Sequence, residues 1–157
     1  VVDGAVSTVA TDHAPWTFEQ KLDPTLGPAE LRQGMAELET SLPMLWSLGV
    51  ATKKISLNRF VEVISTNPAK LFGMYPQKGC IAPGSDADLV VLDPTEKRVI
   101  DGSQMHSAAG YSPYDGWEVE GWPKFTLSRG EIVAEGSSVD AALGRGKLVP
   151  RRPFERP

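Results

Sequence analysis

Residues 6–11 form a short run rich in β-branched side chains, and the run ends at the sequence Asp12-His13-Ala14-Pro15. β-Branched residues favour strands, and Pro15 lacks the amide hydrogen that would continue a ladder. We therefore predict a strand with Asp12 at its C-terminal end. In α/β barrels this end of each strand faces the active site, so Asp12 is a candidate metal ligand or base. The alternative is an ordinary turn, in which Asp and Pro are common.

Composition excludes several classes of protein. The 157 residues are 41% hydrophobic with a net charge of −4, which allows an apolar core and predicts no binding to nucleic acid or an anionic membrane. The single cysteine, Cys80, excludes an internal disulfide and fits a reducing, cytoplasmic setting. No apolar run approaches the roughly 20 residues that span a bilayer. The abrupt start at Val1, without Met, suggests the C-terminal piece of a longer, soluble protein.

The first half of the chain predicts a long loop followed by helices. Residues 16–37 are polar and interrupted by Pro and Gly, as in a binding loop or a lid, although a plain surface loop is the alternative. The apolar spacing predicts helices at residues 38–48, 57–64 and 68–72. Gly49 should stop the first of these helices, Ser56 should cap the second, and Pro68 should separate the second from the third.

The second half predicts β-structure. Apolar runs bounded by Gly and Pro predict strands at residues 87–93, 98–100 and 125–136, with Pro94 ending the first and Arg129-Gly130 turning a hairpin. The aromatic loop 111–117 lies between them; packing or a subunit contact is expected, and ligand binding is the alternative. Residues 141–157 are rich in Gly, Pro and Arg and indicate a tail.

Several segments together resemble one family. The order of strand, Asp-bearing loop, helices and small β unit is similar to the C-terminal third of cyclic-amide hydrolases of the amidohydrolase superfamily, most closely the dihydropyrimidinase and hydantoinase branch. The segments that carry this resemblance are Thr11-Asp12-His13, Ser-Thr-Asn-Pro-Ala-Lys-Leu-Phe-Gly at 65–73, Tyr-Pro-Gln-Lys-Gly at 75–79, Gly-Ser-Asp-Ala-Asp-Leu-Val at 84–90 and Gly-Trp-Pro at 121–123.

The resemblance implies an α/β plus β fold. Residues 1–76 would be the C-terminal end of a (β/α)8 TIM-like barrel, and residues 77–140 the C-terminal strands of a small composite β-sandwich domain. Residues 141–157 would be a C-terminal tail. The family commonly forms homo-oligomers, dimers or tetramers, and the tail and the aromatic loop are candidate subunit contacts.

The resemblance also implies a metal site. Enzymes of this family hold two divalent metal ions, usually zinc, with four histidines, a carbamylated lysine and one aspartate that Asp12 matches. Asp12 would bind one metal, take the proton of the attacking water and pass it to the leaving nitrogen. The chain has only two histidines, His13 and His106, and neither matches a ligand position. The remaining ligands therefore lie outside this chain, and the isolated 157 residues should be inactive.

Two positions concern the substrate, a small cyclic ureide by resemblance. Dihydroorotases carry a histidine that holds the substrate carboxylate where this chain has Trp16, which favours a neutral or apolar substituent. Hydantoinases usually have Pro-Asn-Gly where this chain has Arg32-Gln33-Gly34, so Gln33 is a candidate substrate-binding residue through its backbone.

Other patterns have simpler explanations than chemistry. His13 is expected to orient neighbouring groups rather than bind metal, and His106 to be a surface residue. Cys80 is expected to pack rather than act as a nucleophile, and the acidic segment 84–88 to form a capped turn rather than a cation site. The leading hypothesis is a hydrolase of hydantoins or dihydropyrimidines. The alternatives are a non-catalytic scaffold related to dihydropyrimidinase and another cyclic-amide hydrolase such as allantoinase.

Overall fold

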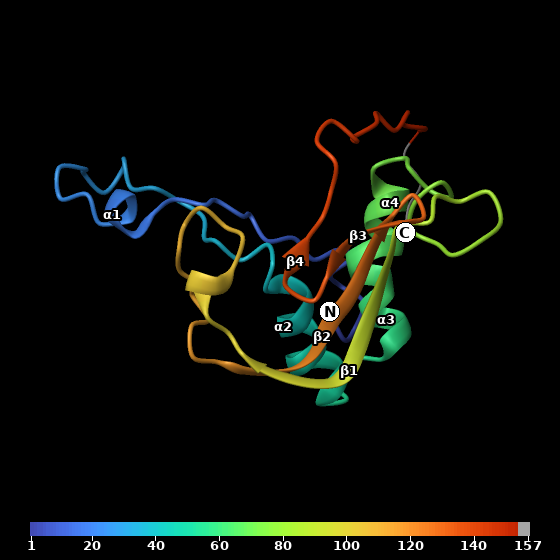
Figure 1. Cartoon of the computed structure of the whole chain (residues 1–157), viewed down its shortest axis with the longest axis horizontal. Helices are drawn as coiled ribbons and strands as arrows, with labels where there is room; N and C mark the ends of the chain where they lie inside the picture. Colours follow the sequence, from blue (N-terminus) through green and yellow to red (C-terminus); the bar gives the residue numbers. More distant parts are fainter. Residues whose placement is uncertain (154–157) are drawn as a thin grey trace.

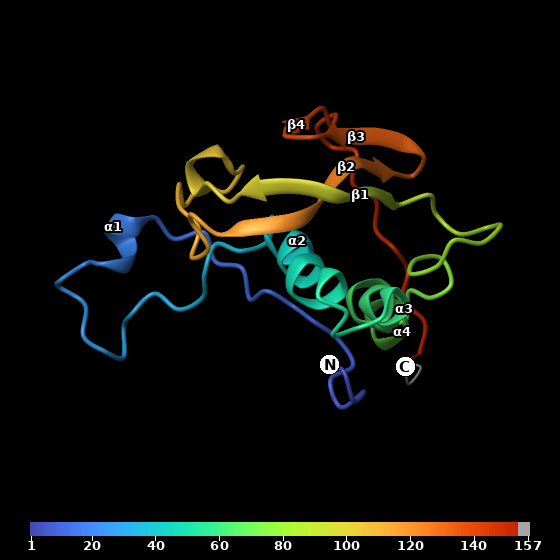
Figure 2. The same cartoon turned by 90° about the horizontal axis from the view of Figure 1, so that it is seen from below.

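The computed structural model describes residues 1–153, in which helices pack on one face of an antiparallel sheet (Figures 1 and 2). A loop carrying the short helix α1, Phe18–Lys21, extends away from these two layers. Thr17 and Gln20 cap this helix reciprocally, each side chain accepting from the backbone amide of the other. No helix in the described part of the chain is long and apolar enough to cross a membrane.

The first long helix runs through the residue that was expected to end it. Helix α2, Ser41–Leu45, continues as a π-helical segment, η1, Trp46–Ala51. The prediction that Gly49 stops the helix was therefore wrong. Gly49 is buried, and a Cβ atom at this position would lie 2.9 Å from Cδ1 of Ile55. The absent side chain thus allows close packing rather than a change of direction.

The next helix is also continuous where a break was expected. Helix α3, Leu57–Val61, passes into a π-helical segment, η2, Glu62–Thr66, and then into α4, Asn67–Leu71. The predicted N-cap is confirmed, since the Ser56 hydroxyl accepts from the amide of Arg59 at 3.1 Å. The expected break at Pro68 was wrong, because the π-helical turn accommodates a residue that has no amide hydrogen.

Residues 6–11 form no strand in the described structure, which corrects the prediction made from their β-branched side chains. Their backbone partners are groups of the second helix rather than a neighbouring strand. The Val9 amide donates to the Val63 carbonyl at 3.0 Å, and Asn67 Nδ2 donates to the Ser7 carbonyl at 2.9 Å. Arg59 donates to the carbonyls of Val1 and Val6. The helix therefore fixes the path of the chain that leads to Asp12.

The sheet is an antiparallel meander in the order β1-β2-β3-β4. Arg129 and Gly130, with φ of 51° and 82°, form the predicted hairpin turn between the second and third strands. The expectation that Pro94 ends the first strand was wrong, because the pairing shifts register between Asp93 and Lys97 and leaves Pro94 in a bulge. The four strands are β1 Leu89–Val99, β2 Glu118–Ser128, β3 Glu131–Glu135 and β4 Ser138–Val139.

A small core joins the sheet to α2. The side chains of Met44, Ile100, Val119 and Trp122 are buried together, and Met105 and Tyr114 pack against them. Strand β2 begins at Glu118, well before the predicted strand at 125, because residues 118–120 pair with Lys97–Val99 of β1. Gly121 has φ of 92°, and a Cβ atom there would lie 2.0 Å from Cδ1 of Trp46. Trp46 also meets Phe60 edge to face, with ring centroids 5.4 Å apart.

The acidic turn at residues 84–88 forms ion pairs within the chain. Lys78 pairs with Asp86 at 2.8 Å and with Asp88. The acidic turn thus binds the chain's own ammonium group, in agreement with the structural role predicted for it.

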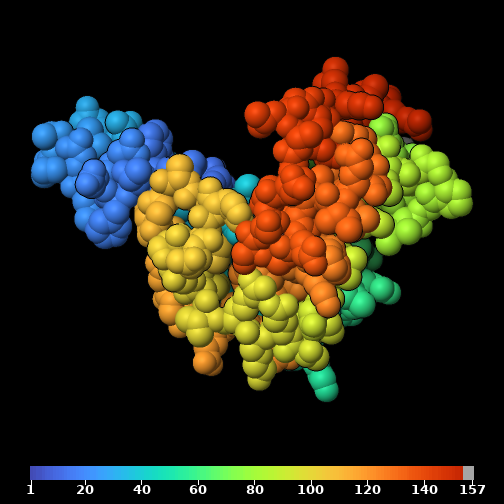
Figure 3. Space-filling view, in the orientation of Figure 1, coloured from blue at the N-terminus to red at the C-terminus, as the bar shows by residue number. Residues whose placement is uncertain are grey.

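The predicted tail loops outward after β4 and returns to the chain near the end of α4 (Figures 1 and 3). Arg145 donates to the Ser128 carbonyl at 2.8 Å and to Glu131 at 3.0 Å. The Arg152 amide donates to the Gly73 carbonyl at 2.7 Å. Residues 154–157 of the predicted tail lie outside the described residues.

Replacing Gly121 with alanine should destabilise the protein by the clash with Trp46 as well as by backbone strain. Gly84 has the same φ of 92° with no atom within 4 Å of an added Cβ, so Gly84→Ala measures the strain alone. We expect Gly121→Ala to lower the free energy of unfolding by about 1–3 kcal/mol more than Gly84→Ala. Urea unfolding of the two variants tests this, and equal losses would contradict the packing argument.

The Lys78 cluster should make stability depend on acid pH. Hydrogen bonds from Lys78 and Gln77 lower the pKa of Asp86 below 3.8. Burial alone would raise the pKa of Asp88, but hydrogen bonds from Lys78 and the Arg129 amide outweigh it, so this pKa is lowered as well. The resulting stabilisation is complete above pH 3.8 and is lost as the pH falls through the lowered pKa values.

We therefore expect the unchanged protein to be more stable than Lys78→Met at about pH 6, with the two converging as the pH falls below about 4. Urea unfolding at a series of pH values measures the difference. A difference that persists undiminished below about pH 3 would contradict the assignment.

Candidate active site

Asp12 lies at a sharp turn in the extended N-terminal segment. Its φ is 51°, a left-handed conformation that few residues other than glycine adopt but that Asp tolerates, and its side chain is exposed. Directly after it, His13 pairs with Met35 in an isolated parallel bridge, and the Ala14 amide donates to the Met35 carbonyl at 3.0 Å. The turn therefore presents a carboxylate from a backbone that is anchored on its C-terminal side.

The loop opposite this turn approaches it closely because residue 34 is glycine. Gly34 has φ of 82°, and a Cβ atom there would lie 2.6 Å from the Ala14 Cβ and 2.9 Å from the Asp12 carbonyl oxygen. A side chain at this position would push the loop away from Asp12. Residues 32–38, called the site loop below, are therefore held directly against the Asp12 turn.

Donors from residues 14–21 bind the carbonyl groups along the site loop. The Trp16 indole donates to the Gln33 carbonyl at 3.1 Å, and the Lys21 ammonium donates to the carbonyls of Arg32 and Gly34. The Arg32 guanidinium lies over the Trp16 ring, 4.8 Å from its centroid. The structure thus brings Trp16 and Gln33, the two candidate substrate-binding residues, into direct contact.

His13 binds the other end of the site loop. Its Nδ1 atom accepts from the amide of Glu37 at 3.2 Å and from the amide of Leu38 at 3.1 Å. The His13 side chain is half-buried, and its own amide donates to the Thr11 hydroxyl. This placement agrees with the expectation that His13 orients neighbouring groups.

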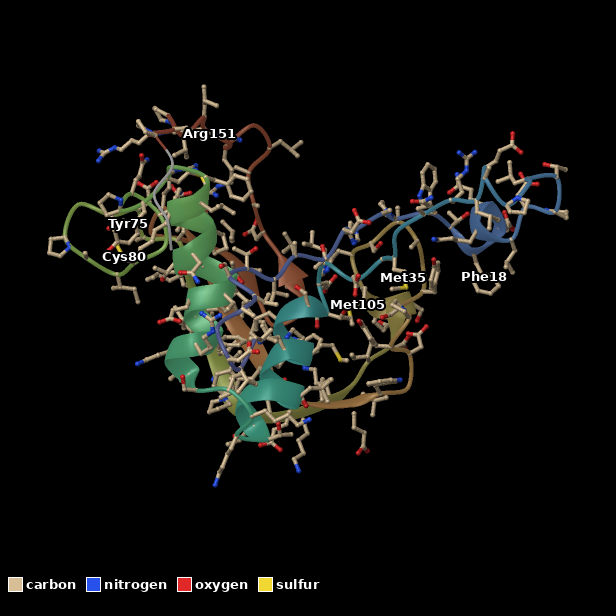
Figure 4. The ribbon with its side chains drawn as sticks, turned by 180° about the vertical axis from the view of Figure 1, so that it is seen from behind. Phe18, Met35, Tyr75, Cys80, Met105 and Arg151 are labelled. Atoms are coloured by element: carbon tan, nitrogen blue, oxygen red, sulfur yellow. The ribbon has the colours of Figure 1, made fainter. Side chains whose placement is uncertain are left out.

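A cavity of about 360 Å³ opens beside His13. Met105, labelled in Figure 4, lines it together with residues of the site loop and of the segment that follows β1. At its edge the Glu39 carboxylate accepts from the His106 amide at 2.8 Å and lies 3.1 Å from His106 Nδ1. His106 is exposed, as predicted, but its contact with Glu39 was not expected, because nothing local in a sequence relates residues so far apart.

A second contact joins the site loop to the segment between β1 and β2. The Tyr114 hydroxyl donates to Glu37 at 3.0 Å. Burial, followed by this hydrogen bond to a carboxylate, raises the pKa of Tyr114 above its usual value, so the phenol stays protonated at neutral pH. The aromatic loop 111–117 therefore packs within the chain, and Tyr111 also meets Phe18 edge to face at 5.6 Å.

The described residues supply at most part of a metal site. Nowhere among residues 1–153 do three or more His, Cys, Asp or Glu side chains gather closely enough to hold a metal ion. A single exposed carboxylate at an anchored turn fits one ligand of a site that other residues complete. Cys80 takes no part: its thiol donates to the Pro76 carbonyl at 3.3 Å and contacts the Ser85 hydroxyl, as expected of a packed residue.

Comparison with known proteins defines the class of this chain. A model of the amidohydrolase family matches residues 1–133, so the chain belongs to that family. Over its full length it is 41% identical to a D-phenylhydantoinase of Escherichia coli O1:K1 / APEC, of which it covers 34%.

Solved structures give the same result. A dihydropyrimidinase from Brevibacillus agri NCHU1002 matches 99% of the chain with a TM-score of 0.93 and 42% identity. A D-hydantoinase (dihydropyrimidinase) from Thermus sp. matches 98% with a TM-score of 0.92 and 37% identity. The chain covers 34% and 33% of these two proteins, so it spans about a third of the length of its relatives. The resemblance to the dihydropyrimidinase and hydantoinase branch is confirmed.

Proposed function

We propose that the full-length protein hydrolyses the ring amide bond of cyclic ureides, namely hydantoins or dihydropyrimidines. The observation that carries this proposal is the Asp12 turn, which presents an exposed carboxylate beside a closely anchored loop. The similarity of the whole chain to a D-phenylhydantoinase supports the same substrate class.

In this proposal Asp12 has two tasks. It would contribute one ligand to a pair of divalent metal ions, zinc by the family resemblance, while the four histidines and the carbamylated lysine come from residues outside this chain. When bound, such ions lower the pKa of water toward neutrality and polarise the ring carbonyl. The Asp12 carboxylate takes a proton from the attacking water. In the same step the water oxygen bonds to the ring carbonyl carbon, and Asp12 then returns the proton to the ring nitrogen as the carbon–nitrogen bond breaks.

The neighbouring residues would shape the substrate pocket. The backbone at Gln33 would contact the ureide ring, and the Trp16 ring would favour a neutral or apolar substituent. The Arg32 guanidinium over Trp16 also places a positive charge at this position. A substrate panel should therefore include a ring that bears a carboxylate.

Residues 1–76 would complete a (β/α)8 barrel and residues 77–140 a β-sandwich, with 141–157 as the tail. The full-length protein would be a homo-oligomer, a dimer or a tetramer, in the cytoplasm.

Ring opening by the purified full-length protein, loaded with zinc, tests the proposed function. The panel contains a 5-aryl hydantoin, dihydrouracil, allantoin and dihydroorotate. We expect turnover of the hydantoin or the dihydropyrimidine. Preferred opening of allantoin would favour an allantoinase. No turnover, together with upstream residues that lack the histidines and the lysine, would favour a non-catalytic scaffold.

Asp12→Asn should remove most of the activity, because an amide cannot accept the proton of the attacking water. We expect turnover to fall roughly 10²–10⁴-fold. Asp140→Asn, an exposed carboxylate after β4, is the control and should keep normal turnover. Near-normal turnover of Asp12→Asn with unchanged metal content would contradict the role of Asp12.

A further inference from the structure

The site loop is held at its two ends by hydrogen bonds of opposite sense. Along its first part, the carbonyls of residues 32–35 accept hydrogen bonds from Lys21, Trp16 and the Ala14 amide. At its far end, the amides of Glu37 and Leu38 donate to Nδ1 of His13. All of these partners lie between His13 and Lys21 in the chain.

The two hydrogen bonds to His13 define the state of its ring. A ring nitrogen accepts only through a free lone pair, so the two donors assign the ring proton to Nε2. One acceptor atom thus serves two successive backbone amides. Glu37 is half-buried next to Ala36, which is 5% exposed, whereas Leu38 is 62% exposed. Removing the acceptor would leave the two amides without their partner.

We infer that His13 is a positioning residue whose Nδ1 atom holds the site loop against the Asp12 turn and so sets the loop backbone for substrate binding. This inference rests on the proposed function, in which the backbone at Gln33 contacts the ring. His13 acts on the loop rather than on the proton transfer, because the bond from the Ala14 amide to Met35 anchors the Asp12 turn without the His13 side chain. Its loss should therefore appear in KM more than in kcat.

Three substitutions in the full-length protein separate the acceptor from the shape of the side chain. His13→Asn places an amide oxygen near the position of Nδ1. His13→Leu has nearly the same shape as the Asn variant but no acceptor. His13→Gln moves the amide oxygen outward, toward the position of Nε2, and serves as the second test if the Leu variant does not fold.

We expect KM for the preferred ureide to rise roughly tenfold in the Leu and Gln variants, with kcat within about threefold of the unchanged protein. His13→Asn should restore KM to within about threefold. Metal content should be equal in all variants. An Asn variant as impaired as the Gln or Leu variant, or an unchanged KM in all three, would overturn the inference.

Hydrogen exchange provides a readout that does not depend on activity. The amides of Glu37 and Leu38 should exchange more slowly in the unchanged protein and the Asn variant than in the Leu and Gln variants. Equal exchange in all four proteins would overturn the claim that Nδ1 holds the loop. If the unchanged protein opens no cyclic ureide, the proposed function fails, while the exchange rates still decide whether His13 holds the loop.

Discussion

The hydrogen bond from the Val9 amide to the Val63 carbonyl attaches the chain that leads to the Asp12 turn to the second helix. In an α-helix that carbonyl would accept from the amide of Asn67, but in the π-helical turn Asn67 donates to Glu62 instead. The residue after it, Pro68, has no amide hydrogen to offer. The helix therefore carries a carbonyl that is free to bind another segment, and the N-terminal segment binds it at 3.0 Å. A proline that looks like a helix breaker thus creates an attachment point for the chain that leads to the candidate site.

The site itself is built mainly from backbone groups. The site loop offers carbonyls to the donors of residues 14–21 and amides to His13. Two of its side chains, Arg32 and Glu37, add contacts with the Trp16 ring and the Tyr114 hydroxyl. Gln33 takes part through its carbonyl, to which the Trp16 indole donates at 3.1 Å. The requirement for glycine at position 34 has a steric origin, because any Cβ there would meet Ala14.

Local signals in the sequence predicted local structure well. The cap at Ser56 and the hairpin turn at Arg129-Gly130 each depend on one side chain or one backbone conformation, and both are confirmed. The errors arose where packing overrides a local rule. Gly49 lies inside a helix because Ile55 fills its place, and Pro94 lies inside a strand because the ladder bulges there. Contacts such as that of Glu39 with His106 join distant parts of the chain and leave no local trace in the sequence. Asp12 was predicted first from a strand at residues 6–11 that the described structure does not contain, and then from the family resemblance, and its role stays a prediction.

The attachment of the C-terminal segment limits how the two layers can move. The helices and the sheet meet at the core around Met44 and Trp122, and Gly121 packs on Trp46 beside it. The C-terminal segment adds a second point of attachment, since Arg145 binds the hairpin and Arg152 binds the end of α4. With the core and the C-terminal segment both in contact, the sheet separates from the helices only if the C-terminal segment detaches first. The two layers should therefore move as one body, and the cavity beside His13 should keep its shape when they do.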